Sequence, residues 1–89
     1  MLTVKRTSIF KSDYKKAIKQ NKDIEKLKEV IITLCKNEQL DPKYKDHPLS
    51  GKFRKYRDCH IEPDWVLIYE INEMELSLIR LGSHSELFD

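Results

Sequence analysis

Three histidines, His47, His60 and His84, are spread over the second half of the sequence, and each lies where an element is predicted to begin or end. Histidine can take up or release a proton near neutral pH. A single histidine is more often structural than catalytic. Three at element boundaries, together with Asp64 and Arg80, instead favour a shared site, provided that the fold brings them together.

Such a set could cleave RNA without a metal ion. The reaction needs a base for the ribose 2′-hydroxyl, an acid for the departing 5′-oxygen and cationic donors for the charge on phosphorus. An arginine fork such as that of Arg80 matches phosphate oxygens. An exposed aromatic such as Phe88 could stack on a base, although a near-terminal Leu87-Phe88 pair could equally hold the tail against the core.

Two other chemistries use the same residues. The three histidines and Cys59 are conceivable zinc ligands, but Cys59 and His60 are adjacent on a predicted strand and point to opposite faces. The sequence therefore predicts no metal and no other cofactor. The same alternation turns Cys59 towards the helices and disfavours a thiol nucleophile. We expect Cys35 and Cys59, which form no CxxC motif, to be reduced thiols.

The composition is that of one small domain, residues 1–89, with 39% hydrophobic and 36% charged residues. No apolar run approaches the ~20 residues needed to cross a bilayer. The N-terminal residues MLTVKRTSIF lack the apolar core of a secretory signal. We therefore expect a cytoplasmic protein that does not contact the membrane.

The net charge of +2 hides an uneven distribution. Residues 1–41 and 42–58 each carry +4, whereas residues 59–89 carry −6. In the segment 43–58, aromatic residues alternate with lysine and arginine, as at surfaces that bind polyanions. Lys52 and Arg57 are its candidate RNA-binding residues. A solvated lysine-rich surface explains the charge alone equally well.

Two helices are predicted after a short strand at residues 3–6. Ser8 is a candidate N-cap for the first helix, and Gln20-Asn21 interrupts the pattern. The second is predicted to start at Asp23. Its apolar residues form a single stripe, so the helical pair must pack on a flat surface; the stripe consists of Ile24, Leu27, Val30, Ile31 and Leu34.

Three further strands are predicted at residues 53–61, 65–71 and 75–81, after a long polar connector. The second, WVLIYEI, is apolar on both faces and is therefore central. Trp65 at its start is expected to fill the core rather than contact RNA. The order β-α-α-β-β-β predicts an α+β domain, a small, largely antiparallel sheet with a helical hairpin on one face.

Alternation along these strands predicts which side chains share a face. Tyr56, Asp58 and His60 should lie on the face without helices. In the last strand Leu76, Leu78 and Arg80 should share one face. Gly82 would then let the backbone bend so that His84 returns over the sheet.

The stretch DHPLSGKFRKYRDCHIEPDWVLIYEI, followed by RLGSHSELF, closely resembles the YafQ-type toxins of the RelE superfamily, from bacterial type II toxin–antitoxin systems. The resemblance is dense from Tyr44 to Phe88, and the N-terminal half agrees in layout. It implies the RelE-like fold and an endoribonuclease that cuts mRNA. It also implies a protein antitoxin as partner and operator DNA as a ligand of the toxin–antitoxin complex only.

Carried over by position, the resemblance implies an acid–base set and a group of RNA contacts. Which histidine is the acid and which the base stays open, as does dependence on the ribosome. A non-catalytic RelE-like module that binds an antitoxin and regulates an operator is the alternative. The acid–base set is His47, His60, Asp64 and His84; the phosphate- or RNA-binding residues are Arg80, Phe88, Lys52, Arg57 and Trp65.

Overall fold

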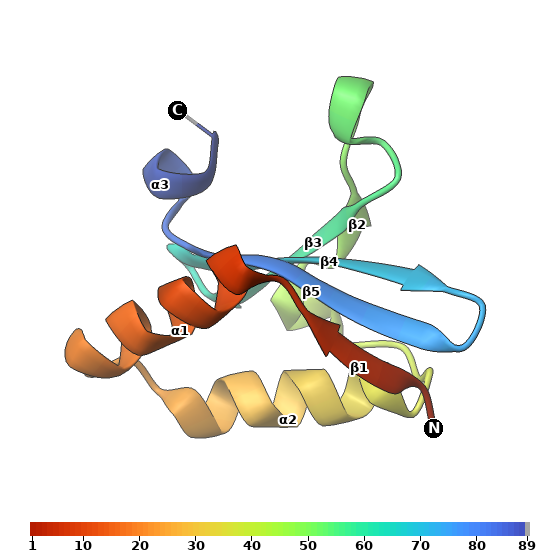
Figure 1. Ribbon diagram of the computed structural model, residues 1–89, viewed down its shortest axis with the longest axis horizontal. Helices are drawn as coiled ribbons and strands as arrows, with labels where there is room; N and C mark the ends of the chain where they lie inside the picture. Colours follow the sequence, from red (N-terminus) through yellow and green to blue (C-terminus); the bar gives the residue numbers. More distant parts are fainter. Residues whose placement is uncertain (89) are drawn as a thin grey trace.

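The structure is a computed structural model that describes residues 1–88. A five-stranded sheet carries α2 on one side, while α3 and the turn η2 stand over the other (Figure 1). The predicted β-α-α-β-β-β order is correct, with a short strand and a terminal helix added. The elements are β1 (Thr3–Arg6), α1 (Ser8–Lys19), α2 (Ile24–Cys35), η1 (Pro42–Tyr44), β2 (His47–Pro48), η2 (Gly51–Phe53), β3 (Arg57–Glu62), β4 (Trp65–Asn72), β5 (Glu75–Gly82) and α3 (His84–Phe88).

Short polar side chains fix where the two long helices begin. Thr7, not Ser8 as predicted, is the N-cap of α1, and its hydroxyl accepts from the Phe10 N–H. Asp23 caps α2 as predicted. Asn21 and Asn37 follow the helices with φ of 60° and 59°, the left-handed conformation that commonly ends a helix.

The sheet has the strand order β1-β5-β4-β3-β2, so the doubly apolar strand β4 is central as predicted. All pairings are antiparallel except β1 with β5, which is parallel. The predicted stripe of α2 covers this sheet: Leu27, Val30 and Leu34 are at most 3% exposed. Trp65 and Tyr69 are the largest side chains of the core beneath them.

A β-bulge in β5 overturns one prediction. Ile68 pairs with Arg80, whereas Tyr69 pairs with Leu78, so Ile79 is an extra residue. Leu76 and Leu78 pack in the core on the helix side, and Arg80 is shifted to the opposite face. The hydroxyl of Thr7 donates to the Ile79 carbonyl at 2.8 Å, which ties the bulge to the start of α1.

The predicted strand at residues 53–61 is also wrong at its start. Phe53 ends the short helical turn η2, and β3 begins only at Arg57. The polar connector before it contains η1 and the two-residue strand β2, which pairs with β3 at the edge of the sheet. His47 is therefore a strand residue rather than a loop residue. Among residues 1–88, no helix is long and apolar enough to span a membrane.

Candidate active site

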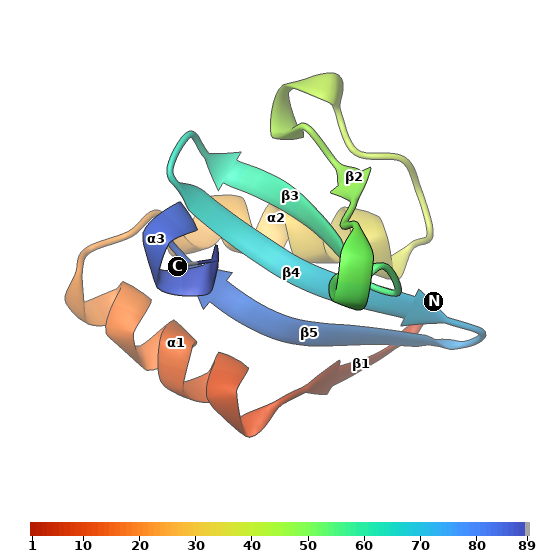
Figure 2. The same ribbon diagram turned by 90° about the horizontal axis from the view of Figure 1, so that it is seen from above.

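The face of the sheet opposite α2 carries a row of four side chains, three of which are polar. His47 pairs with Asp58, Asp58 with Ile68, and Ile68 with Arg80, so these four residues are neighbours across four strands. His60 lies two residues beyond Asp58 on β3 and points to the same face. Figure 2 looks onto this face, where β2, β3 and α3 border one area.

The three histidines meet there. The ring centroids of His47 and His60 are 6.4 Å apart, and those of His60 and His84 are 6.0 Å apart. The ring of Phe88 lies 4.9 Å from that of His84. The convergence that the sequence required is thus present, and His60 is its centre.

A hydrogen bond to the main chain orients the ring of His47. Its Nδ1 lies 2.8 Å from the carbonyl oxygen of Lys45. Because a carbonyl can only accept, Nδ1 must carry the hydrogen. In the neutral ring, Nε2 then keeps a lone pair that can accept a proton.

The position of His84 is set by the ends of neighbouring elements. Gly82 lets α3 pack closely, since a Cβ there would lie 3.1 Å from Glu86 Oε1. Ser83 and Glu86 form a capping box: Ser83 N–H donates to Glu86 Oε1, and Glu86 N–H donates to Ser83 Oγ. An ion pair from Lys16 to Glu86 fastens α3 to α1.

Asp64 contacts this site at the main chain of His84 and not at a histidine ring. Its Oδ1 accepts from the main-chain N–H of His84 at 3.0 Å. Asp64 is exposed at the turn between β3 and β4. The geometry therefore gives Asp64 a role in holding the first residue of α3, whereas the family resemblance implies that Asp64 belongs to the acid–base set.

Two substitutions of Asp64 separate these roles. Asn keeps an oxygen that can accept from the His84 N–H, so Asp64→Asn should retain most of the RNA cleavage that the sequence predicts. Asp64→Ala removes that acceptor, a loss of about 1 kcal/mol for a helix cap, and should lower cleavage severalfold. The measurement is the single-turnover rate of each variant. An equally large loss in both variants would mean that Asp64 acts through its charge or its proton.

Asp58 is a buried carboxylate in the middle of the histidines. It is 2% exposed, and its Oδ1 lies 3.2 Å from His47 Nδ1. The Nδ1 hydrogen is directed at Lys45, so Asp58 Oδ1 has no hydrogen-bond partner within residues 1–88. Burial raises the pKa of Asp58, and the three histidines oppose this rise. The sequence predicts Asp58 on this face but does not place it in the acid–base set.

Asp58→Asn should make the protein more stable at neutral pH. Because the pKa of Asp58 is raised on folding, the folded state binds its proton more tightly, and ionisation destabilises it as pH rises. Removing the buried charge should therefore add about 1 kcal/mol to the free energy of unfolding at pH 7. The gain should shrink as pH falls and Asp58 becomes protonated. Urea unfolding between pH 4 and pH 7 measures it; a loss of stability at pH 7 would contradict this account.

Asp13 of α1 orients the side chain of Arg80. Its Nε and Nη2 donate to the two carboxylate oxygens of Asp13 at 2.9 and 3.2 Å, which raises the pKa of the guanidinium. Asp13 also accepts from the Leu81 N–H. Arg80, Phe88 and Ile68 are among the residues that line a depression of about 200 Å³. An ordered cation thus adjoins an aromatic ring beside the histidines.

Four other candidates lie elsewhere. Arg57 is on the helix-side face of β3 and bonds to Asp46, so it does not reach the histidines. Trp65, 2% exposed, is in the core as expected and cannot stack on RNA. Cys59 is fully buried, which raises the pKa of its thiol and removes it as a nucleophile. Lys52 is exposed on η2.

Comparison with known proteins identifies the family. A sequence model described as "Bacterial toxin of type II toxin-antitoxin system, YafQ" matches residues 2–89. The mRNA interferase toxin YafQ of Escherichia coli is 45% identical over 80 residues, 89% of this chain and 87% of that protein. The chain belongs to the YafQ family of bacterial toxins.

Solved structures of bacterial toxins have the same fold. The E. coli DinJ–YafQ complex contains a chain that is 40% identical, with a TM-score of 0.93 and full coverage of both chains. A copper-bound mutant toxin from Helicobacter pylori is 48% identical, with a TM-score of 0.96 over 99% of this chain and 100% of that one. The α+β, RelE-like class expected from the sequence is thereby confirmed.

The copper in that Helicobacter relative makes the ligand geometry of this chain relevant. Within residues 1–88, no three histidine, cysteine or carboxylate side chains are grouped so that they could hold a metal ion. The centroids of neighbouring imidazole rings are 6.4 and 6.0 Å apart.

Proposed function

We propose that this YafQ-family toxin is an endoribonuclease that cleaves mRNA by acid–base catalysis in the cytoplasm and is neutralised by a protein antitoxin. The observation that carries the proposal is the meeting of three imidazoles beside an ordered arginine on the open face. The names of the E. coli relative, an mRNA interferase, and of the DinJ–YafQ complex support the substrate and the partner.

In the proposed mechanism, His60 and one neighbouring histidine act on a single phosphodiester. The base takes the proton of the 2′-hydroxyl, whose oxygen attacks the adjacent phosphorus. The acid protonates the departing 5′-oxygen, and the products are a 2′,3′-cyclic phosphate and a 5′-hydroxyl. Each neighbouring pair of rings is about 6 Å apart, a distance that one phosphate group can bridge, so His60 belongs to either possible pair.

Arg80 and Phe88 would hold the RNA. Negative charge builds up on the phosphate oxygens during the reaction. Because Asp13 already orients the Arg80 guanidinium, this group can donate to those oxygens without reorganising first. Phe88 is 36% exposed and lies against His84, so a base stacked on it would place its ribose near the imidazoles. Lys52 on the overhanging turn would add attraction for the RNA backbone.

The nucleophile provides the decisive test. An mRNA with a single 2′-deoxynucleotide on the 5′ side of the cut should resist cleavage, while the all-ribose RNA yields a cyclic phosphate end. Both RNAs are tested free and on ribosomes, which also reveals whether the ribosome is required. Cleavage of the deoxy substrate at the same rate would exclude attack by the 2′-hydroxyl. Abolition of free-RNA cleavage by a chelator would exclude the metal-free mechanism.

The alternative is a RelE-like module that binds an antitoxin and regulates an operator without cleaving RNA. It predicts that His60 can be replaced without any effect on growth when the protein is expressed in bacteria. The oriented Arg80 and the central position of His60 argue against it, because neither contributes to the hydrophobic core.

A further inference from the structure

Two exposed aromatic rings stand over the face that carries the histidines. Phe53 of the turn η2 is 42% exposed, and Phe88 of α3 is 36% exposed. Figure 1 shows η2, in green, and α3, in blue, as separate projections above the sheet. Both rings line the depression of about 200 Å³ beside Arg80, and Tyr56 adds a third aromatic side chain to its lining. Apolar side chains gathered in one exposed area, unlike those scattered singly, mark a binding site.

Main-chain hydrogen bonds hold Phe53 and Tyr56 in one loop. The Tyr56 N–H donates to the Phe53 carbonyl at 2.9 Å, and the Leu49 N–H donates to the Tyr56 carbonyl at 3.0 Å, which closes the loop around η2. Gly51 begins η2 with a φ of 66°, a conformation that favours glycine. The two rings are therefore in place before a ligand arrives, which lowers the entropic cost of binding.

The loop that presents Phe53 is strongly basic. Lys52, Arg54 and Lys55 flank the ring, are exposed and form no ion pair with residues 1–88. The lining of the depression contains one charged side chain, that of Arg80, and no carboxylate. Aromatic rings combined with cationic side chains fit single-stranded RNA, whose bases stack on the rings while its phosphates meet the positive charges.

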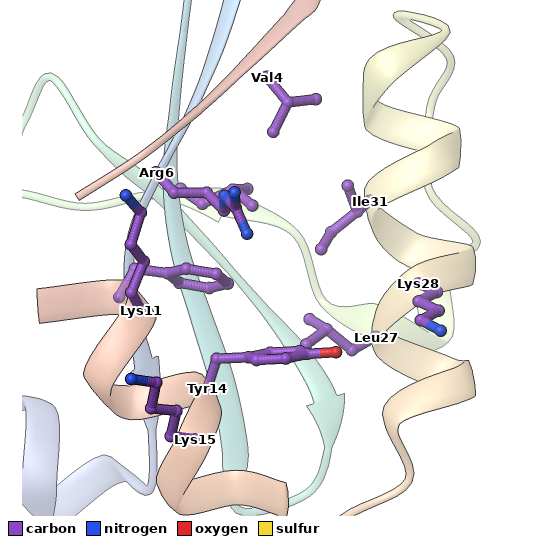
Figure 3. A pocket seen from close by; sticks show the side chains of 10 residues that line it. Val4, Arg6, Lys11, Tyr14, Lys15, Leu27, Lys28 and Ile31 are labelled. Atoms are coloured by element: carbon purple, nitrogen blue, oxygen red, sulfur yellow. The ribbon is translucent and has the colours of Figure 1, made fainter. Parts of the chain in front are cut away.

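The depression adjoins the candidate active site. The ring of Phe88 lies 4.9 Å from that of His84, and Arg80 lines the same depression. A base held there would keep the phosphate of its own nucleotide near both His84 and Arg80. A larger hollow of about 580 Å³ lies between β1, α1 and α2 (Figure 3), but no histidine lines it. A base in that hollow would not be next to the cleaved phosphate.

We propose that the depression beside Arg80 binds one nucleobase of the RNA, from a nucleotide next to the cleaved phosphate, and that Phe53 and Tyr56 hold this base together with Phe88. The inference rests on the proposed function and deepens it, because it gives the η2 loop a part in placing the substrate. Splayed bases of single-stranded RNA are commonly held by stacking on aromatic side chains.

The test uses the whole toxin and an mRNA fragment whose cleavage position has been mapped, free or on ribosomes according to which form is cut. Because every base offers a ring face for stacking, the base is removed altogether. Two further RNAs carry a single abasic ribonucleotide, which keeps its 2′-hydroxyl, on the 5′ or the 3′ side of the cut. Single-turnover rates over a range of toxin concentrations separate RNA affinity from the rate of the bound complex.

Four variants are compared. Phe53→Leu and Tyr56→Leu each remove a ring but keep an apolar side chain, whereas Phe53→Tyr keeps a ring. Met74→Ala removes an exposed apolar side chain from the turn between β4 and β5, outside the depression, and is the matched control. Urea unfolding and antitoxin binding are measured for every variant, so that a folding defect is recognised.

The wild-type toxin should cleave one of the two abasic RNAs about tenfold less efficiently, within the range that base stacking contributes. Phe53→Leu and Tyr56→Leu should cleave the complete RNA less efficiently by a similar factor. They should lose little more with the abasic RNA, because a ring and the base that stacks on it act together. Phe53→Tyr should keep the abasic penalty, and Met74→Ala should match the wild type.

Equal cleavage of the complete and the abasic RNAs by the wild type would overturn this inference and leave the acid–base mechanism in place. Leucine variants that keep the full abasic penalty would also overturn it. So would leucine variants that bind the antitoxin more weakly but cleave every RNA normally, because the occupant would then be a protein. A wild-type toxin that cleaves no RNA in either form would refute the proposed function, and this inference with it.

Discussion

Replacing His60 by glutamine should reduce the rate of RNA cleavage by about 10²- to 10⁴-fold, the usual contribution of a general acid or base. His60 is the middle ring, 6.4 Å from His47 and 6.0 Å from His84, so its loss breaks both possible acid–base pairs. The measurement is single-turnover cleavage with saturating enzyme. Because His60 is only partly buried, the free energy of unfolding should stay within about 0.5 kcal/mol of wild type.

A double substitution sharpens this result. If His47 and His60 act on one phosphate, His47→Gln/His60→Gln should be little worse than His60→Gln alone, because residues that act as a unit are not additive. Matched antitoxin binding by all variants would show that the surface is intact. If the folded His60→Gln protein cleaved RNA at the wild-type rate, His60 could not be the acid or the base of the proposed mechanism.

Replacing Trp65 by alanine should have the largest effect on stability, a loss of about 3–5 kcal/mol. Trp65 is 2% exposed and is the largest of the fully buried side chains. A domain of this size is commonly stable by only about 5–15 kcal/mol. Urea denaturation should therefore show a much lower midpoint, and little folded protein should remain at 37 °C.

Trp65→Phe distinguishes a core role from contact with RNA. Phenylalanine fills most of the same space, so this variant should remain folded and cleave RNA at nearly the wild-type rate per folded molecule. A folded Trp65→Phe protein with strongly weakened RNA binding would show that the indole ring reaches the substrate after all.

The sequence was sufficient where one side chain pattern decides the structure. The apolar stripe of α2, with its 3.6-residue repeat, leaves few alternatives to packing on the sheet. The apolar residues on both faces of β4 leave few alternatives to a central position in the sheet. Both predictions are correct. The N-cap of α1 was placed one residue late, at Ser8, because Thr7 and Ser8 can both cap a helix. Only the tertiary bond from Thr7 to the Ile79 carbonyl separates them.

Two features of the last strand and the tail were missed although the sequence contains a signal for each. Leu76, Leu78 and Leu81 all lie in the core, so strict alternation must fail between Leu78 and Leu81, which indicates the bulge. Ser83 and Glu86 have the spacing of a capping box, which indicates α3. The leucine spacing and the Ser83–Glu86 spacing each involve few residues, so they become convincing only when the surrounding structure is known.

The convergence of the histidines could not be predicted from residue types and spacing alone. His47 depends on a two-residue strand that follows Lys45, whose φ is 50°. His84 depends on the Asp64 cap and on the close approach of α3 to Gly82. Each is a contact between segments far apart in the chain, and no local pattern encodes such distances.

The contact between Asp13 and Arg80 means that helix α1 both packs against the core and orients a residue of the candidate site. Tyr14 of α1 packs against the core, and the preceding residue, Asp13, holds the Arg80 guanidinium and the Leu81 N–H. We therefore expect that a displacement of α1 changes the position of the Arg80 guanidinium. A ligand that shifts α1 is therefore expected to slow RNA cleavage without covering the face that carries the imidazoles.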